Sequence, residues 1–116
     1  ARDFNETIVN TIKKSADALD RAVKKSSEKD RWLGFSVGCL SAAIEGITDS
    51  RFDTKYKERI VVMTKVIAAD IKYLNEPGSK KYIYNKLESM NASVKQNSTT
   101  DKVKKMLLSI IANQFK

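Results

Sequence analysis

Residues 30–47 read DRWLGFSVGCLSAAIEGI, and this stretch decides the fold class. Its apolar residues recur every three or four positions, which is the spacing of one face of an α-helix. No charged residue occurs between Arg31 and Glu45, so we expect this helix to be the central and most buried one. Asp30 is the expected N-cap. The apolar face comprises Trp32, Phe35, Cys39, Leu40, Ala43, Ile44 and Ile47. Four of them are expected to be largely buried, namely Trp32, Cys39, Leu40 and Ile44.

The same helical spacing continues on both sides of this stretch. Apolar stripes occur in residues 4–23, 56–74, 83–94 and 103–115. Polar or turn-forming segments lie at 48–53, 75–78 and 96–99. Pro77 and Gly78 mark the clearest break, after which Ser79 is the expected cap of the next helix, and Thr100 or Asp101 that of the last. No segment alternates at period two for long enough to form a paired strand. The sequence therefore predicts a single all-α domain over residues 1–116, with about five amphipathic helices and antiparallel neighbours.

Gly34 and Gly38 form a G-x-x-x-G spacing. In a membrane-spanning helix this spacing lets two backbones approach closely. Here polar residues interrupt the apolar run, which falls short of the roughly 20 residues that cross a bilayer, so the chain is not expected to span a membrane. We instead expect the two glycines to allow tight helix packing inside the core of a water-soluble domain.

The composition excludes several classes of chemistry. The chain has 116 residues, 41% of them apolar, with no histidine and one cysteine. Histidine-dependent triads, histidine-ligated metals and a disulfide scaffold are therefore ruled out. The acidic residues are interleaved with lysines, and the four glycines do not gather into a phosphate-binding loop. We expect no catalytic residue, no metal and no cofactor, and hence a protein that is not an enzyme.

The single cysteine, Cys39, lies on the expected apolar face. A buried and inert thiol is the simpler interpretation. A disulfide to a second chain stays open, because an unpaired cysteine in a secreted protein can serve that purpose.

Three N-x-S/T sequons begin at Asn5, Asn91 and Asn97. Such sequons matter only in a secreted protein, although short ones also arise by chance. The chain begins at Ala1 with neither an initiator methionine nor an apolar leader, as expected of a protein whose signal peptide has been removed or of a trimmed chain. We expect a secreted protein, with Asn97, in a polar loop, and Asn5 as candidate glycosylation sites.

The net charge of +8 lies almost wholly in the second half of the chain. Residues 59–116 hold 11 basic and 4 acidic side chains, whereas residues 1–58 hold 11 and 10. A basic surface on the last two helices would attract acidic partners, although a lysine-rich solvated face gives the same pattern. The candidate partner-binding residues are Lys80, Lys81, Tyr82, Lys102, Lys104 and Lys105. Tyr73, Tyr82 and Tyr84 are either exposed interface anchors or half-buried side chains that close the end of the bundle.

Nucleic acid is not the expected partner of this surface. Only 5 of the 22 basic residues are arginine, and base recognition prefers arginine. An acidic protein surface, a sulfated glycan or an anionic lipid fits better. The last helix is basic on one side and apolar on the other, as in helices that lie on membranes, but a core helix of a bundle has the same pattern and is favoured.

The whole chain resembles the anopheline mosquito salivary proteins of the anophensin and albicin type. The resemblance rests on a lysine-rich, all-helical chain that starts ARDF, and on DRWLGF at residues 30–35 at the entry to a buried helix. It implies a secreted inhibitor of host plasma cascades that acts without catalysis. One branch of the family blocks the alternative complement pathway by binding its convertase, and another binds factor XII and kininogen of the contact system. We therefore expect a complement inhibitor that serves immune evasion, with contact-system inhibition or binding to anionic glycans as the alternatives.

Overall fold

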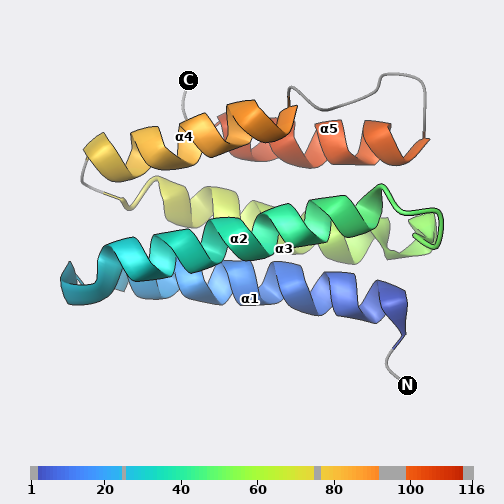
Figure 1. Ribbon diagram of the computed structural model, residues 1–116, viewed down its shortest axis with the longest axis horizontal. Helices are drawn as coiled ribbons and strands as arrows, with labels where there is room; N and C mark the ends of the chain where they lie inside the picture. Colours follow the sequence, from blue (N-terminus) through green and yellow to red (C-terminus); the bar gives the residue numbers. More distant parts are fainter. Residues whose placement is uncertain (1–2, 25, 75–76, 92–98, 114–116) are drawn as a thin grey trace.

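The computed structural model describes residues 3–24, 26–74, 77–91 and 99–113. Within these ranges the chain forms five α-helices and no strand. The helices are α1 (Phe4–Lys24), α2 (Lys29–Ile47), α3 (Lys57–Ile71), α4 (Pro77–Asn91) and α5 (Thr99–Ala112), with 3-10 turns at Ser26–Glu28 and Thr54–Tyr56. Consecutive helices run in opposite directions (Figure 1). The predicted all-α fold with a single domain is confirmed.

The helices enclose one core. α1 packs against α2 and α3, and α2 also contacts α4 and α5. α5 contacts α3 and α4 as well. In Figure 1, α1 lies along one edge, α2 and α3 form the middle, and α4 and α5 cover the opposite edge. The α4–α5 pair therefore covers the side of α2 and α3 that faces away from α1.

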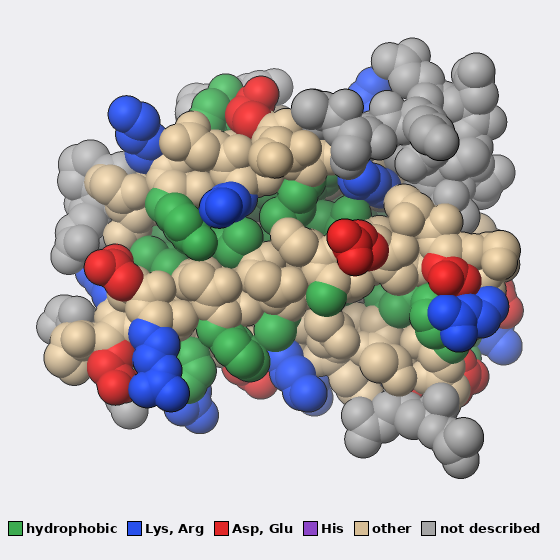
Figure 2. Space-filling view, in the orientation of Figure 1, with side chains coloured by type: hydrophobic (Ala, Val, Ile, Leu, Met, Phe, Trp, Pro, Cys, Tyr) green, Lys and Arg blue, Asp and Glu red, His purple; other side chains and the backbone are tan. Residues whose placement is uncertain are grey.

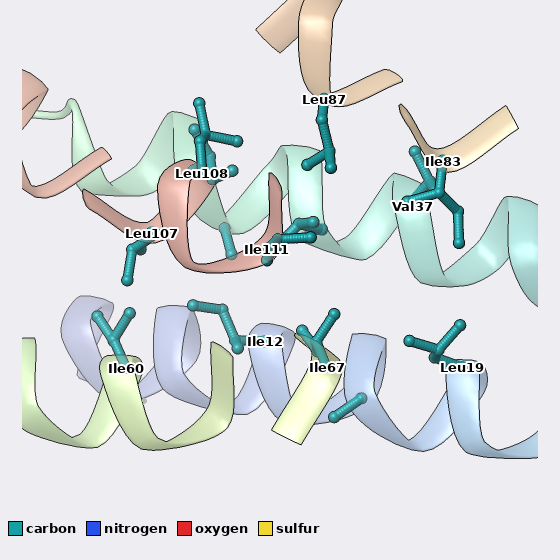
Figure 3. Close-up of a cluster of buried hydrophobic side chains, with 14 of the residues drawn as sticks. Ile12, Leu19, Val37, Ile60, Ile67, Ile83, Leu87, Leu107, Leu108 and Ile111 are labelled. Atoms are coloured by element: carbon teal, nitrogen blue, oxygen red, sulfur yellow. The ribbon is translucent and has the colours of Figure 1, made fainter. Parts of the chain in front are cut away.

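The core consists of the apolar stripes that the helical spacing predicts. Ile12 and Leu19 of α1, Ile60 of α3, and Leu107 and Ile111 of α5 are each less than 2% exposed. Figure 3 shows Ile12 and Ile60 opposite Leu107 and Ile111 of α5, and Leu19 farther along α1, across from Val37 and Ile83. Burying one such side chain stabilises a fold by about 1.5–3 kcal/mol relative to leaving it exposed. The contacts among these side chains therefore hold α1 and α3 against α5.

Three helices begin earlier than the sequence predicts. α2 starts at Lys29, because the 3-10 turn before it already places Glu28 at the N-cap, and Asp30 falls in the first turn. α4 starts at Pro77 rather than after Ser79, since proline lacks only an N–H group that has no partner at a helix start. Ser79 is accordingly a buried residue inside α4. α5 begins at Thr99 rather than after Thr100 or Asp101.

The expected burial of α2 is confirmed on one face and wrong on the other. Leu40 and Ile44 are buried, as predicted. Trp32 and Cys39 are only partly buried, and Phe35 is 50% exposed. The physical reason is that α1, α4 and α5 together cover only the inward side of α2. The absence of charges between Arg31 and Glu45 therefore does not mean that every side of α2 is buried.

The expectation of tight packing at Gly34 and Gly38 is also wrong. A Cβ atom added to either residue meets no atom within 4 Å. The close approach occurs instead at Gly46, where an added Cβ lies 2.9 Å from Cγ1 of Ile8. A second close contact between α1 and α2 is made by Ser15 and Ser36, whose hydroxyl oxygens are 3.1 Å apart.

Alanine should therefore have opposite effects at these glycines. Gly38→Ala should raise the free energy of unfolding by up to about 1 kcal/mol, because alanine is the better helix former and has open space. Gly46→Ala should lower it by on the order of 1 kcal/mol, because the buried Ile8 must move and overpacking outweighs the gain in helix propensity. Urea unfolding followed by circular dichroism measures both, and equal shifts of the two midpoints would contradict the packing described here.

Candidate partner-binding surface

α4 carries an exposed face of tyrosine and lysine side chains. Ile83 and Leu87 are buried at a spacing of four residues, so the opposite side of this helix points into solvent. The residues on that side include Lys81, Tyr82, Tyr84 and Lys86, which we call the α4 face. The Nζ atom of Lys86 lies 5.7 Å from the centre of the Tyr82 ring, within the range of a cation–π interaction that orders both side chains.

The exposure of the tyrosines favours one of the two interpretations drawn from the sequence. Tyr82 and Tyr84 are 39% and 42% exposed, and Tyr73, which follows α3, is 58% exposed. Their rings therefore do not close the end of the bundle. Large aromatic side chains that already protrude are suited to anchor a partner, because they bury much apolar area at little cost in side-chain entropy.

The candidate lysines do not form a single patch. Lys80 is half-buried and Lys81 exposed at the start of α4, and Lys105 is exposed on α5. Tyr84 and Glu88 of α4 line a small pocket with Leu108 and Ala112 of α5, so Lys105 lies level with the other end of α4. Ten helical residues separate the two levels, which corresponds to about 15 Å along the helix axis. The side chain of Lys102 lies outside the described residues.

The prediction that Lys104 lies on the partner-binding surface is wrong, because this residue is only 7% exposed. It lies one turn before Leu107 and Leu108, both of which are buried in the core. Residues at this spacing share a helix face, so the fold directs the aliphatic part of Lys104 toward the interior. The lysine-rich sequence KVKK at residues 102–105 did not reveal that one of these lysines lies on the apolar side of the helix.

An open hollow of about 370 Å³ adjoins the α4 face. Asp30 and Leu33 line it from α2, and Gly78, Ser79 and Tyr82 line it from α4. Tyr82 therefore belongs both to the hollow and to the lysine-bearing side of the helix. In Figure 2, hydrophobic side chains are visible along the line where α4 meets α2, with cationic side chains around them. This combination suits the binding of a protruding side chain of a partner protein.

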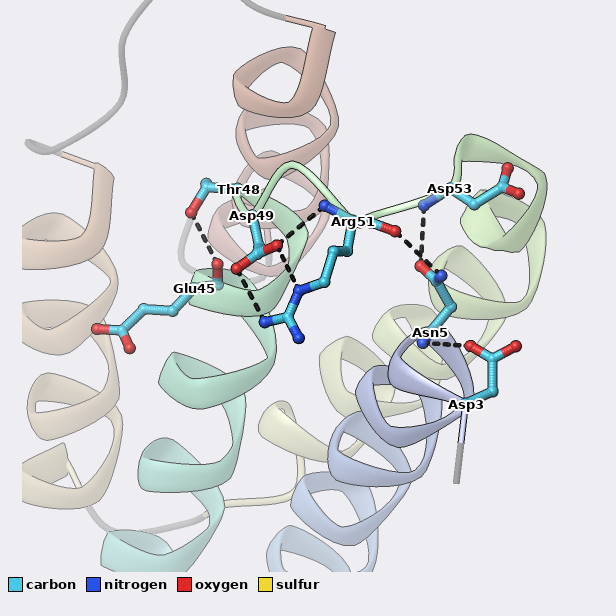
Figure 4. Close-up of polar contacts among 7 residues, drawn as sticks. All are labelled: Asp3, Asn5, Glu45, Thr48, Asp49, Arg51 and Asp53. Carbon is cyan, nitrogen blue, oxygen red and sulfur yellow. Dashed lines mark hydrogen bonds and ion pairs between the residues drawn. The ribbon is translucent and has the colours of Figure 1, made fainter. Parts of the chain in front are cut away.

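The prediction that Asn5 is a glycosylation site is wrong for the folded protein. Its side chain is buried, its Nδ2 atom donates a hydrogen bond to the carbonyl of Arg51 at 3.2 Å, and its Oδ1 atom accepts one from the N–H of Asp53 at 2.8 Å. Figure 4 shows the amide inserted between α1 and the segment before α3. A glycan on Nδ2 has no room there. Asn97 lies outside the described residues.

Asn5 belongs to a polar network that fastens the start of α1, which sequence reasoning missed. Tyr56 Oη donates to Asp3 Oδ2 at 3.3 Å, and Arg59 forms a bidentate ion pair with Glu6. The guanidinium of Arg51 also lies 4.0 Å from the centre of the Phe4 ring. The partners are 46 to 53 residues apart in the chain, so no local pattern could have revealed them.

The carboxylates of this region titrate below their usual range. A backbone hydrogen bond from Asn5 lowers the pKa of Asp3, and the hydrogen bond from Arg59 lowers the pKa of Glu6. The side chain and backbone of Arg51 lower the pKa of Asp49 to about 2. Each carboxyl group is therefore more acidic in the folded chain than in the unfolded chain, where its pKa is about 4.

Acid should consequently destabilise the fold through these groups. Between the lowered folded pKa and the unfolded pKa, the unfolded chain binds more protons, so stability rises with pH and is lost as the pH falls from about 4 toward 2. Asp49→Asn should lower stability at neutral pH and flatten this acid-induced loss. Asp70→Asn is the control. Burial raises the pKa of Asp70, because protonation of this carboxyl group removes the cost of burying its negative charge. Urea unfolding across this pH range tests the prediction, and an unchanged slope in Asp49→Asn would contradict it.

Cys39 is partly buried on α2. This burial raises the pKa of its thiol, against a smaller opposing effect of Lys14. The thiolate is the reactive form, so the higher pKa makes Cys39 a poor nucleophile at neutral pH, in line with the interpretation of an inert thiol.

Two further kinds of site are absent from the described residues. In residues 3–24, 26–74, 77–91 and 99–113, no group of three or more cysteine or acidic side chains is placed to hold a metal ion. No helix in the same residues is long and apolar enough to cross a membrane. The chain matches no family model, no curated protein and no solved structure.

Proposed function

We propose that the protein is a secreted inhibitor of the host alternative complement pathway, which binds the convertase and holds it in an unproductive state without catalysis. The observation that carries the binding role is the α4 face, where Tyr82 and Tyr84 are exposed on the same helix as Lys81 and Lys86. Tyr82 lines an open hollow toward α2, and Tyr84 lies on the flank toward α5. The partner follows from the resemblance to salivary inhibitors described above.

The chemistry of the α4 face fits a large acidic protein. Exposed tyrosines supply apolar area and a hydroxyl group each, which is the composition of energetically dominant interface residues. The lysines around them accelerate association with a negatively charged surface and select against basic ones. The cation–π contact between Lys86 and Tyr82 holds two of these side chains in place before binding, which reduces the entropy lost when the complex forms.

The test is lysis of unprotected red cells by the alternative pathway in human serum, with increasing amounts of the purified protein. We expect dose-dependent protection and a saturable complex with the assembled convertase. The variant Lys81→Glu/Lys86→Glu should need at least about tenfold more protein for the same protection, since a loss of 1.4 kcal/mol corresponds to tenfold in affinity. The matched control is Lys57→Glu/Lys65→Glu on α3, where both lysines are also exposed.

Two results would refute this proposal separately. Absence of protection and of convertase binding at micromolar concentration removes complement as the target. Protection that is equally strong in both double variants removes the α4 face as the binding surface.

Contact-system inhibition is the second candidate, and the exposed cations of α4 and α5 favour it. It predicts a prolonged surface-activated clotting time in the presence of the protein, and an unchanged time would count against it. Binding to anionic glycans predicts retention on heparin that falls in Lys81→Glu/Lys86→Glu. The separation of Lys105 from the lysines that begin α4 makes one compact glycan site less favourable than a protein interface.

A further inference from the structure

The outward side of α2 is a helix face that no other element in the described residues covers. It comprises Arg31, Gly34, Phe35, Gly38, Ala42 and Glu45, which we call the α2 face; Gly34 is partly exposed and the other five residues are exposed. Phe35 is half exposed and packs its ring edge-on against Trp32, with 6.1 Å between the ring centres. Figure 2 shows the front of α2 as a strip of backbone and small side chains with hydrophobic side chains above and below it.

The spacing of this face makes it complementary to itself. Arg31, Gly38 and Glu45 are seven residues apart, so they lie in one line along two turns on each side of Gly38. If two copies of α2 cross antiparallel at Gly38 around a twofold axis, Arg31 of one copy lies opposite Glu45 of the other, and the reverse pair forms at the other end. The same register places Phe35 opposite Ser41 and beside Ala42, where small side chains leave room for its ring.

We propose that the α2 face binds the α2 face of a second copy of this chain, as an antiparallel helix pair centred on Gly38. Neither Gly34 nor Gly38 serves packing within the monomer, because an added Cβ meets nothing within 4 Å at either position. Between two copies, the absence of side chains at these positions lets the backbones approach closely and admits the ring of Phe35.

Charge identifies a second copy as the occupant. The whole chain carries +8, almost all of it on residues 59–116, so the surface formed by these residues repels another copy. The α2 face holds one arginine and one glutamate, so it is locally neutral, and its two charges pair only in the antiparallel arrangement. The side chain of Arg31 is 77% exposed, and its contacts are long, 3.6 Å to Glu28 and 6.0 Å to the centre of the Trp32 ring, so it can turn toward a partner. The contact spans about 21 Å of helix, which corresponds to a small interface and a weak dimer.

The proposal is independent of the proposed function, and its test is a charge swap. Sedimentation equilibrium across the micromolar range should show the mass rising from 13.1 kDa toward twice that value. Arg31→Glu alone and Glu45→Arg alone should each weaken the dimer by about tenfold, because each variant places two like-charge pairs at the ends of the helix contact. The double variant R31E/E45R restores both pairs and should return the dissociation constant to within about threefold of the original.

Two further variants separate the dimer from the fold. Gly38→Leu should abolish the dimer without lowering the thermal unfolding temperature, because the added side chain has open space in the monomer and blocks the crossing point in the dimer. Glu58→Arg on α3 is the control and should leave the dimer unchanged. The proposal is overturned if the protein stays at 13.1 kDa throughout, or if a dimer forms that responds neither to Gly38→Leu nor to the charge swap, since it would then use another surface.

Discussion

Ile12→Ala should lower the free energy of unfolding by about 2–5 kcal/mol, the cost of removing a large aliphatic side chain from a closed core. Ile12 has no exposed surface and belongs to the cluster in which α1, α3 and α5 meet (Figure 3). The loss combines the transfer free energy of the removed methylene and methyl groups with the cost of the cavity. A domain of this size is stable by about 5–15 kcal/mol in total, so this loss is a large share of its stability.

Thermal and urea unfolding followed by circular dichroism measure this loss. Val62→Ala is the control, because Val62 lies on the exposed side of α3 and its truncation should change stability by no more than about 0.5 kcal/mol. If Ile12→Ala and Val62→Ala unfold at the same denaturant concentration, α1 is not packed against the rest of the bundle as described.

The number of helices and their inward faces could be predicted from the sequence because both follow from local periodicity. Ile8, Ile12 and Leu19 recur at helical spacing, and all three are buried. The starts of α2 and α4 were predicted less well, since one depends on a 3-10 turn and the other on a proline that fits the first helical position. The exact start of a helix depends on small differences in free energy, which the apolar pattern does not reveal.

Contacts between distant parts of the chain could not be predicted. Asn5 resembles an accessible sequon in the sequence, and only the approach of residues 51–53 shows that its amide is buried and bonded at both ends. Lys104 resembles its neighbours in a charged segment, and only the orientation of α5 places it on the inward side. For the candidate surface, Lys81 and Tyr82 are exposed side by side at the start of α4, and the sequence could not show that Lys105 lies level with the other end of that helix.

The small residues of α2 show most clearly what the sequence could not predict, namely the point where α1 and α2 approach closely. The sequence offers Gly34 and Gly38 as the natural point of close helix approach, yet both face open space. The close approach is made at Gly46 and at Ser36, and Ser36 is no more prominent than other serines in the chain. Residues 32–44 carry no charge on any side of α2, so the sequence does not show which side α1 covers.

Ser36→Leu should therefore destabilise the protein strongly, although serine to leucine improves the apolar pattern of α2. Ser15 Oγ donates to the carbonyl of Ser36 at 2.7 Å, and Ser36 Oγ donates to the carbonyl of Ser15 at 2.9 Å. A serine side chain of each helix thus reaches the backbone of the other, so no space remains for three additional carbon atoms. We expect α1 and α2 to be forced apart, with a loss of about 1–3 kcal/mol from overpacking and about 1 kcal/mol more from the broken hydrogen bond.

Two control variants make this prediction decisive. Ser36→Ala removes the hydroxyl without adding volume and should cost about 1 kcal/mol, so the difference between Ser36→Ala and Ser36→Leu measures the lack of space. Ser89→Leu makes the same chemical change at an exposed position of α4 and should leave stability within about 0.5 kcal/mol of the original. Urea unfolding of the three variants should rank Ser36→Leu far below Ser36→Ala. If Ser36→Leu is as stable as Ser36→Ala, the backbones of α1 and α2 lie farther apart than the serine hydrogen bonds require. That result would contradict a close contact between α1 and α2 at Ser15 and Ser36.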